Sequence, residues 1–319
     1  MKKVLLLFIV LFGTILFSAC DKTEEEVDIY TSIYPLEFIV REIVQDKYVV
    51  KSVYPRGKDV HSYDASPQAI MSMSKSKLIF YIGLGLEKII EDVKDSALAN
   101  VPTIPVSTNI TLLESNSDHL HDHDENDDHT GIFYDPHIWL DPSRMMTITD
   151  TILENLLLYL ELDDLTVNEF CEKAEDLKDR LTALDNEFRE SLNRDEISSK
   201  TIMIDHDAYA YWEDCYGVKR IRMRNDNDSA DVTPAQMQEK IQLAKNLNIK
   251  YVCTTKNESE SAIIKTYLDA MGLTESAKQQ LHNLSTITTD EEKAGYNYFS
   301  IMRQNLIVLN VVLPRKSNN

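Results

Sequence analysis

The stretch TVNEFCEKAEDLKDRLTALDNEFRESLN, residues 166–193, decides the fold. Its apolar side chains recur at spacings of three and four, as they do on one face of an α-helix. These positions are Phe170, Ala174, Leu177, Leu181, Leu184 and Phe188. At about 1.5 Å per residue, such a helix is roughly 40 Å long. The apolar stripe is too wide and the repeat too short for a coiled coil, so we expect a rigid strut that runs along both halves of the molecule.

A second helix is predicted directly before this strut. Asp141 can cap its N-terminus, and Pro142 suits the first helical position because its ring presets the backbone. The helix runs to about Leu160, and a break at 162–164 separates it from the long helix. The helical stretch in the middle of the chain is therefore longer than a crossover connection within one domain needs to be.

On either side of these helices the chain alternates between apolar, β-branched runs and helical patterns. The runs are VDIYTSI, YVVKSVY, KLIFYIG and VPTIPVS in the first half, and KTIMID, VKRIRMR, IKYVCTT and LHNLSTITT in the second. Helical patterns lie at 36–45, 66–74 and 234–247. This order predicts an α/β protein of two lobes, each a mostly parallel sheet with flanking helices, joined by one long rigid helix. We expect the lobes at 28–165 and 195–319 and the linking helix at 166–194.

The first residues have the pattern of an export signal. Lys2 and Lys3 precede an apolar run over 4–17, which is too short and too early for a convincing membrane span. Ser18 and Ala19 before Cys20 resemble a bacterial lipobox, which predicts a signal peptide at 1–19 and a lipid on Cys20. Residues 20–27 then form a polar tether, and the domain is held at the extracytoplasmic face of the cell membrane. The alternative is an ordinary signal peptide that is cleaved near a cysteine.

Charge and composition exclude several function classes. The formal net charge is −20, which repels nucleic acid and anionic lipid but attracts cations. The chain has only 8 glycines and no Gly-rich phosphate loop. Export leaves Cys171, Cys215 and Cys253, an odd number without a CxxC pair, so a cysteine zinc knuckle is not expected. We interpret the three as small buried apolar residues.

Four of the 8 histidines lie in one acidic segment, SDHLHDHDENDDH. They are His119, His121, His123 and His129. We expect residues 115–130 to be a mobile, solvated loop, because so polar a segment cannot bury a core. Imidazole mixed with carboxylate also makes a weak cation binder, so the loop is predicted to collect metal near the main site.

The other four histidines, His61, His137, His206 and His282, stand alone near the ends of predicted strands or beside turns. His206 follows the run KTIMID and is predicted to open a helix. In open α/β sheets, ligands bind at the carboxyl ends of the strands, so these side chains are candidates for one site between the lobes. Neutral imidazole suits zinc, copper, nickel and iron. For a histidine taken alone, a surface or hydrogen-bonded core position is the alternative.

Three motifs make the chain resemble the metal-specific solute-binding lipoproteins of bacterial ABC transporters, in particular the zinc-type branch. They are YPRGKDVHSYDASP at 54–67, DPHIWLDP at 135–142 and TIMIDHDAYAYWEDCYGV at 201–218. The acidic, histidine-rich insertion before the second motif is also typical of that branch. The resemblance covers essentially the whole chain, and it implies two α/β lobes joined by one long helix.

The resemblance implies that His61 and His137 bind the metal from the N-terminal lobe and His206 from the C-terminal lobe. Two positions depart from the family pattern, since Thr255 stands where relatives commonly have glutamate, and Leu-His-Asn-Leu replaces Leu-Asp-Pro-Leu around His282. The fourth ligand is then His282, a water molecule, a loop residue, or the carboxylate of Glu258 or Glu260.

The expected function is capture of zinc in the cleft between the lobes and delivery to a membrane ABC permease, by a monomer that touches the membrane only through its lipid. Three imidazoles favour zinc over manganese, which prefers oxygen ligands. Other divalent transition metals, or a role as a surface adhesin, are the alternatives. A zinc hydrolase is not expected, because the sequence has no HExxH helix to supply a general base.

Overall fold

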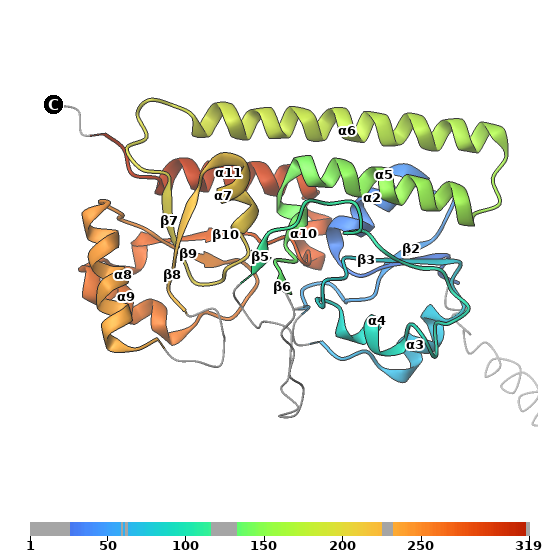
Figure 1. The fold of residues 1–319 in the computed structure, drawn as a ribbon, viewed down its shortest axis with the longest axis horizontal. Helices are drawn as coiled ribbons and strands as arrows, with labels where there is room; N and C mark the ends of the chain where they lie inside the picture. Colours follow the sequence, from blue (N-terminus) through green and yellow to red (C-terminus); the bar gives the residue numbers. More distant parts are fainter. Residues whose placement is uncertain (1–25, 59, 61–62, 116–132, 225–231, 317–319) are drawn as a thin grey trace, which may run out of the picture.

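The computed structural model describes residues 26–58, 60, 63–115, 133–224 and 232–316 (Figure 1). The predicted signal peptide, Cys20 and most of the tether lie outside the described residues. His61 and the four histidines of the 115–130 segment lie outside them as well. Within the described part of the chain, no helix is both long and apolar enough to cross a membrane.

The N-terminal lobe is built on a parallel sheet of strand order β2-β1-β3-β4. Its strands are β1 (Ile29–Thr31), β2 (Val50–Ser52), β3 (Leu78–Tyr81) and β4 (Thr103–Pro105). Its helices are α2 (Tyr34–Val44), α3 (Pro67–Met73) and α4 (Lys88–Val93). The central strands β1 and β3 are buried along their length, as expected for a sheet covered on both faces. A short antiparallel pair, β5 (Glu114–Ser115) and β6 (Phe133–Tyr134), leads out of this lobe.

The C-terminal lobe repeats the design with a parallel sheet of order β10-β9-β7-β8. Its strands are β7 (Thr201–Ile204), β8 (Lys219–Arg222), β9 (Val252–Thr255) and β10 (Lys278–Leu281). Its helices are α7 (Ala210–Tyr216), α8 (Pro234–Asn246), α9 (Ala262–Met271), η2 (Glu275–Ala277) and α10 (Thr289–Lys293). The predicted fold class, two parallel α/β lobes, is confirmed.

A layer of long helices covers both lobes from one side (Figure 1). It contains α5 (Pro142–Tyr159), α6 (Asp164–Leu192) and α11 (Tyr298–Val312). Helix α6 has 29 residues, and its N-cap Asp163 accepts a hydrogen bond from the N–H of Thr166. The buried side of α6 is the predicted apolar stripe, extended to Leu192. Because one continuous hydrophobic core contains this stripe and side chains of both lobes, the helix joins the lobes into one packed unit.

Two local predictions are wrong. The segment LHNLSTITT (281–289) was expected to be a strand, but only Leu281 belongs to one, namely the end of β10. Leu284 has a left-handed φ of 62°, and the Asn283 side chain accepts the Ser285 N–H, so the backbone turns where a strand would continue. His206 was expected to open a helix, whereas α7 begins only at Ala210.

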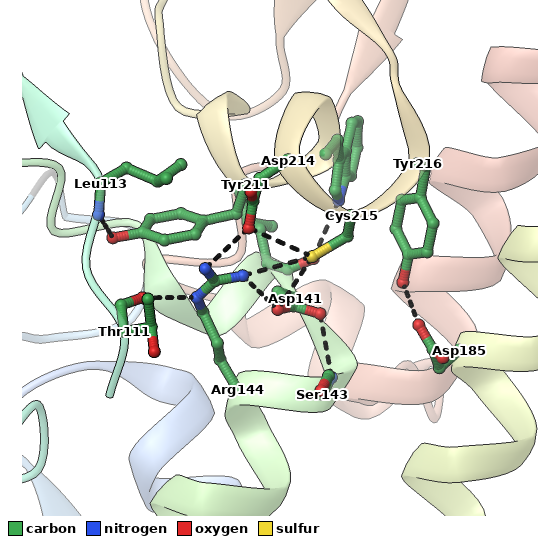
Figure 2. Close-up of polar contacts among 12 residues, drawn as sticks. Thr111, Leu113, Asp141, Ser143, Arg144, Asp185, Tyr211, Asp214, Cys215 and Tyr216 are labelled. Carbon is green, nitrogen blue, oxygen red and sulfur yellow. Dashed lines mark hydrogen bonds and ion pairs between the residues drawn. The ribbon is translucent and has the colours of Figure 1, made fainter. Parts of the chain in front are cut away.

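Side chains around Arg144 form a polar joint between the lobes (Figure 2). The guanidinium of Arg144, on α5, donates to Asp141 at 2.6 Å and to Asp214, at the end of α7, at 2.8 Å. It also donates to the Cys215 sulfur and to the carbonyl oxygen of Thr111. A surface cavity of about 420 Å³ opens beside this joint. Arg144 thus pairs with Asp141 at the start of α5 and with Asp214 of the C-terminal lobe, so this joint holds the two lobes against each other.

Candidate metal centre

His137 is buried in the loop between β6 and the short 3-10 helix η1 (Ile138–Leu140). The Asp135 Oδ1 atom accepts the backbone N–H of His137 at 2.9 Å and lies 2.9 Å from the ring Nδ1. Because a carboxylate can only accept, this contact places the ring proton on Nδ1 and the lone pair on Nε2. A metal-binding histidine is commonly oriented by a carboxylate in this way.

His206 lies two residues after the end of β7 and brings a second imidazole from the C-terminal lobe to the first. The ring centroids of His137 and His206 are 5.6 Å apart, and the rings are perpendicular. Two imidazoles bound to one tetrahedral zinc ion, with Zn–N distances of about 2.0–2.1 Å, have centroids about 5 Å apart. The separation of the two rings is therefore close to that of two imidazoles that share one ion.

Glu258 faces the Nδ1 atom of His206, as Asp135 faces the Nδ1 atom of His137. Its Oε2 atom is 3.6 Å from the Nδ1 atom of His206, and its Oε1 atom accepts a hydrogen bond from the Asn283 side chain at 2.7 Å. The carbonyl oxygen of Asn283 in turn accepts the indole N–H of Trp139 at 2.6 Å. Since Trp139 belongs to η1, the polar contacts around His206 connect back to the segment that carries His137.

His282 is buried, and both of its ring nitrogens face protein groups. Its Nδ1 atom accepts the backbone N–H of Leu284 at 2.9 Å, which uses the lone pair of that nitrogen. Its Nε2 atom lies 3.6 Å from Glu291 and 3.4 Å from the amide nitrogen of Asn257. The Asn305 side chain holds both backbone polar groups of His282. This arrangement offers no support for the prediction that His282 is the fourth ligand.

The surroundings of His282 are those of a structural ion-pair cluster. Burial by itself would raise the pKa of Glu291, but contacts with His282 and with Lys256, 2.7 Å away, lower it strongly. The Glu291 carboxylate also closes the N-terminus of α10 through a capping box with Thr288. His282 thus lies against a buried carboxylate that caps a helix, and Lys256 supplies the positive charge beside it.

Among the residues that the structure describes, no three His, Cys, Asp or Glu side chains form a group that could hold a metal ion. The third predicted histidine, His61, is not among them. The described loop before it docks on the C-terminal lobe, because the Gly57 N–H donates to the carbonyl oxygen of Ile287 and to the Thr286 hydroxyl. Two of the four lone histidines, His137 and His206, are therefore brought together, and His282 is set apart.

The three cysteines of the C-terminal two-thirds of the chain are free thiols. Cys253 is buried as predicted, whereas Cys171 is exposed on α6, which corrects that prediction. Burial raises the pKa of Cys215 and of Cys253 to about 12, and the Asp141 carboxylate adds to the effect at Cys215. Both remain neutral thiols at physiological pH, so neither presents the thiolate that a zinc ion binds.

Sequence reasoning overlooked Asp135, Asn283 and Trp139, and it gave Glu258 only a minor place. A signal for Asp135 was present, because a carboxylate two residues before a histidine can reach the ring in a tight turn. The contact between Glu258 and Asn283 joins residues 25 apart. No short sequence pattern reports such a pair.

Comparison with known proteins identifies relatives along nearly the whole chain. The family model described as zinc-uptake complex component A, periplasmic, or ZnuA, matches residues 29–311. The zinc-binding lipoprotein AdcA of Streptococcus pneumoniae is 26% identical over 313 residues, which is 97% of this chain but 60% of that protein. The chain thus spans only about three-fifths of that relative.

Two further proteins extend the comparison. The manganese-binding lipoprotein MntA of Halalkalibacterium halodurans is 24% identical and is matched over 91% of this chain and 99% of its own length. The crystal structure of the Zn(II)-bound ZnuA-like domain of Streptococcus pneumoniae AdcA superposes with a TM-score of 0.71 at 23% identity, over 91% of this chain and 99% of that domain. The superposition with this domain shows that the fold is shared. The match to the ZnuA family model over residues 29–311 assigns the sequence to a family. On this evidence the chain belongs to the ZnuA family.

Proposed function

We propose that this protein is the extracytoplasmic zinc-binding component of a bacterial ABC importer, which captures zinc between its lobes and delivers it to a membrane permease. One observation carries the proposal: His137 and His206, from different lobes, present perpendicular rings 5.6 Å apart. Membership of the ZnuA family and the zinc-binding name of the AdcA relative support the same cargo. The proposal contains no catalytic step.

In this proposal His61, His137 and His206 bind the ion. Nε2 is the binding atom of His137, because Asp135 holds the proton on Nδ1. A water molecule or a residue of the 115–130 segment completes the tetrahedron, because Glu258 lies on the Nδ1 side of His206, and His282 supports the fold away from the site. The histidines at 119, 121, 123 and 129 collect zinc loosely and pass it to this centre.

Manganese is the alternative cargo, favoured by the match to MntA along almost its full length. The chemistry of the described ligands argues for zinc, because imidazole nitrogen suits zinc better than it suits manganese. A carboxylate in place of His206 would shift the balance toward manganese, since oxygen ligands suit that ion.

We further propose that cleavage before Cys20 and lipid attachment to its thiol hold the protein at the outer face of the membrane, as a monomer. Two relatives carry the word lipoprotein in their names, which supports the anchor. The segment from Cys20 to Val27 then acts as a short tether.

The test is metal content and affinity after the mature protein is stripped and reloaded with equimolar zinc and manganese. We expect one tightly bound zinc per chain, with weaker sites in addition. His206→Ala should weaken the tight site by more than about 100-fold, because the loss of a ligand exceeds the cost of losing an orienting group. His206→Asp should retain a site but bind manganese relatively better.

Thermal unfolding of the metal-free variants provides the control for folding, since His206 is partly exposed and its loss should leave the metal-free protein folded. A wild-type preference for manganese, or the absence of any tight site, would contradict the proposed cargo. An unchanged zinc affinity in His206→Ala would contradict the proposed site.

A further inference from the structure

A groove of about 460 Å³ lies on the N-terminal lobe, where the described chain begins. It is bounded by the first described residues, by β2 and by α3. The lining residues are Glu26, Val27, Lys51, Gln68, Met71, Ser72 and Lys75. Helix α3 is fixed to the sheet by a 2.7 Å hydrogen bond between Ser72 and Tyr30 of β1, so the groove has a rigid floor. Helix α3, which bounds it, lies on the side of the sheet opposite to α6 (Figure 1).

Two lysines and one glutamate, Glu26, supply the charge of the groove on a strongly acidic protein. Lys51 and Lys75 are exposed, and neither takes part in an ion pair among the residues that the structure describes. Neighbouring lysines behave differently, since Lys47 pairs with Glu169 and Lys77 with Asp28. With a net charge of −20 the chain has an excess of carboxylates, so two unpaired lysines in one groove are available to an external anion.

An apolar side chain lines the same groove as these lysines. Met71 is 61% exposed, among the most exposed of the large hydrophobic side chains. A cationic rim around an exposed, flexible apolar side chain is the combination that peripheral proteins present to a lipid interface. Although the overall charge of −20 repels anionic lipid, this local pair of lysines beside Met71 gives the groove the chemistry of a surface for phospholipid headgroups.

The start of the described chain indicates which surface this groove meets. Glu26 lines the groove, and Cys20 precedes it by only six residues. Six extended residues span at most about 20 Å, so a lipid on Cys20 would hold the groove within that distance of the bilayer. At so short a range, contact between the groove and the headgroups costs little additional entropy.

We propose that this groove is the membrane-contacting surface of the anchored protein. Lys51 and Lys75 bind the phosphates of anionic phospholipids, and Met71 enters the interfacial region. The contact orients the molecule with α3 toward the bilayer and α6 away from it. This inference rests on the proposed lipid anchor at Cys20.

The test uses the lipidated protein on vesicles of brominated phosphatidylcholine, with or without phosphatidylglycerol. Met71→Trp places a fluorescent reporter in the groove, and bromine quenches only a tryptophan that reaches the bilayer. The matched control is Leu165→Trp, because Leu165 is 80% exposed at the start of α6 on the opposite face. Trp139 and Trp212 are fully buried and give both variants the same background.

We expect strong quenching of the Met71→Trp variant on vesicles that contain phosphatidylglycerol, and little quenching of the Leu165→Trp variant. Lys51→Glu together with Lys75→Glu should abolish the quenching, as should removal of the anionic lipid. Equal quenching of the two reporters would overturn the proposal. So would quenching that appears only after Glu24→Gln and Glu25→Gln, since the lysines would then be occupied by the acidic tether.

Co-sedimentation with the vesicles separates this inference from the anchor on which it rests. A chain that co-sediments but shows no quenching is anchored and does not use the groove. A chain that fails to co-sediment overturns both the anchor and the groove. Zinc affinity of the Met71→Trp variant should equal that of the wild type, which verifies that the reporter leaves the fold intact.

Discussion

A carboxylate stands behind each of the two histidines that the fold brings together. Asp135 holds the Nδ1 proton of His137, and Glu258 lies 3.6 Å from the Nδ1 atom of His206. The shorter of the two contacts fixes a tautomer and a ring orientation before any metal arrives. Such orienting groups raise metal affinity because the ligand loses less freedom on binding.

Asp135→Asn should weaken zinc binding by about 10–100-fold, because an amide no longer favours the tautomer that offers Nε2. The measurement is a competition titration against a chelator of known affinity. Asp269→Asn, on the exposed side of α9, is the matched control and should leave the affinity unchanged. If Asp135→Asn binds zinc as tightly as the wild type, the Asp135 contact does not prepare the site.

His282→Ala should affect stability and spare the metal. The substitution leaves the buried N–H of Leu284 without an acceptor and removes a partner of Glu291, at a cost of about 1–3 kcal/mol in the free energy of unfolding. Chemical denaturation of the metal-free protein measures that loss, and a zinc titration measures the site. If His282→Ala lowers the zinc affinity as much as His206→Ala does, His282 is a zinc ligand after all.

Glu87 predicts a pH dependence of stability that is separate from metal binding. Burial raises its pKa from the ordinary value of 4.5 to about 7, although hydrogen bonds from Ser32 and from the N–H groups of Ile82 and Gly83 oppose the shift. An acid whose pKa is higher in the folded state binds more protons when folded. The free energy of unfolding therefore falls as the pH rises between these two values, by at most about 1.4 kcal/mol per pH unit.

Glu87→Gln cannot ionise, so its free energy of unfolding should lack this component between about pH 5 and about pH 8. The quantity to measure is the difference between wild type and variant, in metal-free protein, so that histidines common to both cancel. Glu190→Gln, exposed on α6, should follow the wild type. A difference that stays constant with pH would show that Glu87 has an ordinary pKa.

At the scale of elements, α6 is where the two lobes share one core. Phe170, near its start, packs on Tyr48 of the N-terminal lobe. Phe188, near its end, packs on Trp212 and Tyr216 of α7 in the C-terminal lobe. Both phenylalanines are fully buried, so each end of one rigid helix is held by a different lobe.

Phe170→Ala and Phe188→Ala should each lower the free energy of unfolding by about 3–5 kcal/mol, since each leaves a cavity in a packed core. Because one core cluster joins α6 to both lobes, we expect each variant to unfold in a single transition followed alike by fluorescence and circular dichroism. Phe188→Leu should cost less than Phe188→Ala, as it fills part of the cavity. Two separate transitions would mean that the lobes fold independently of the helix.

The elements were predictable where the pattern was periodic and strong. The stripe of α6 and the Asp141-Pro142 start of α5 depend only on local spacing and capping. The prediction of a strand at 281–289 is wrong because β-branched composition does not reveal that the Asn283 side chain accepts the Ser285 N–H and that Leu284 has a left-handed φ. The role of His282 could not be foreseen for the same reason, since a backbone N–H two residues away uses its lone pair.

At the scale of the whole molecule, buried hydrogen bonds tie the segment around His137 to the C-terminal lobe. The Tyr211 hydroxyl donates to the carbonyl oxygen of Asp135, and the Trp212 indole donates to that of Leu140. Here the donors are in the C-terminal lobe. In the reverse sense, the Trp139 indole beside His137 donates to the carbonyl oxygen of Asn283 in the C-terminal lobe. Wide opening of the lobes would break all of these bonds in addition to bending the helical layer.

Zinc binding should therefore change the shape of the molecule very little. We expect the radius of gyration from small-angle X-ray scattering to differ by less than about 1 Å between the metal-free and zinc-loaded protein, as in other preorganised complexes. Tyr211→Phe removes one of the ties without opening a cavity, and it should increase the difference if these bonds restrain the lobes. The same scattering experiment on His206→Ala with excess zinc gives the baseline, because that variant lacks one side of the proposed site. A wild-type change of several ångströms would show that the lobes close as a hinge and that the interlobe bonds are remade on binding.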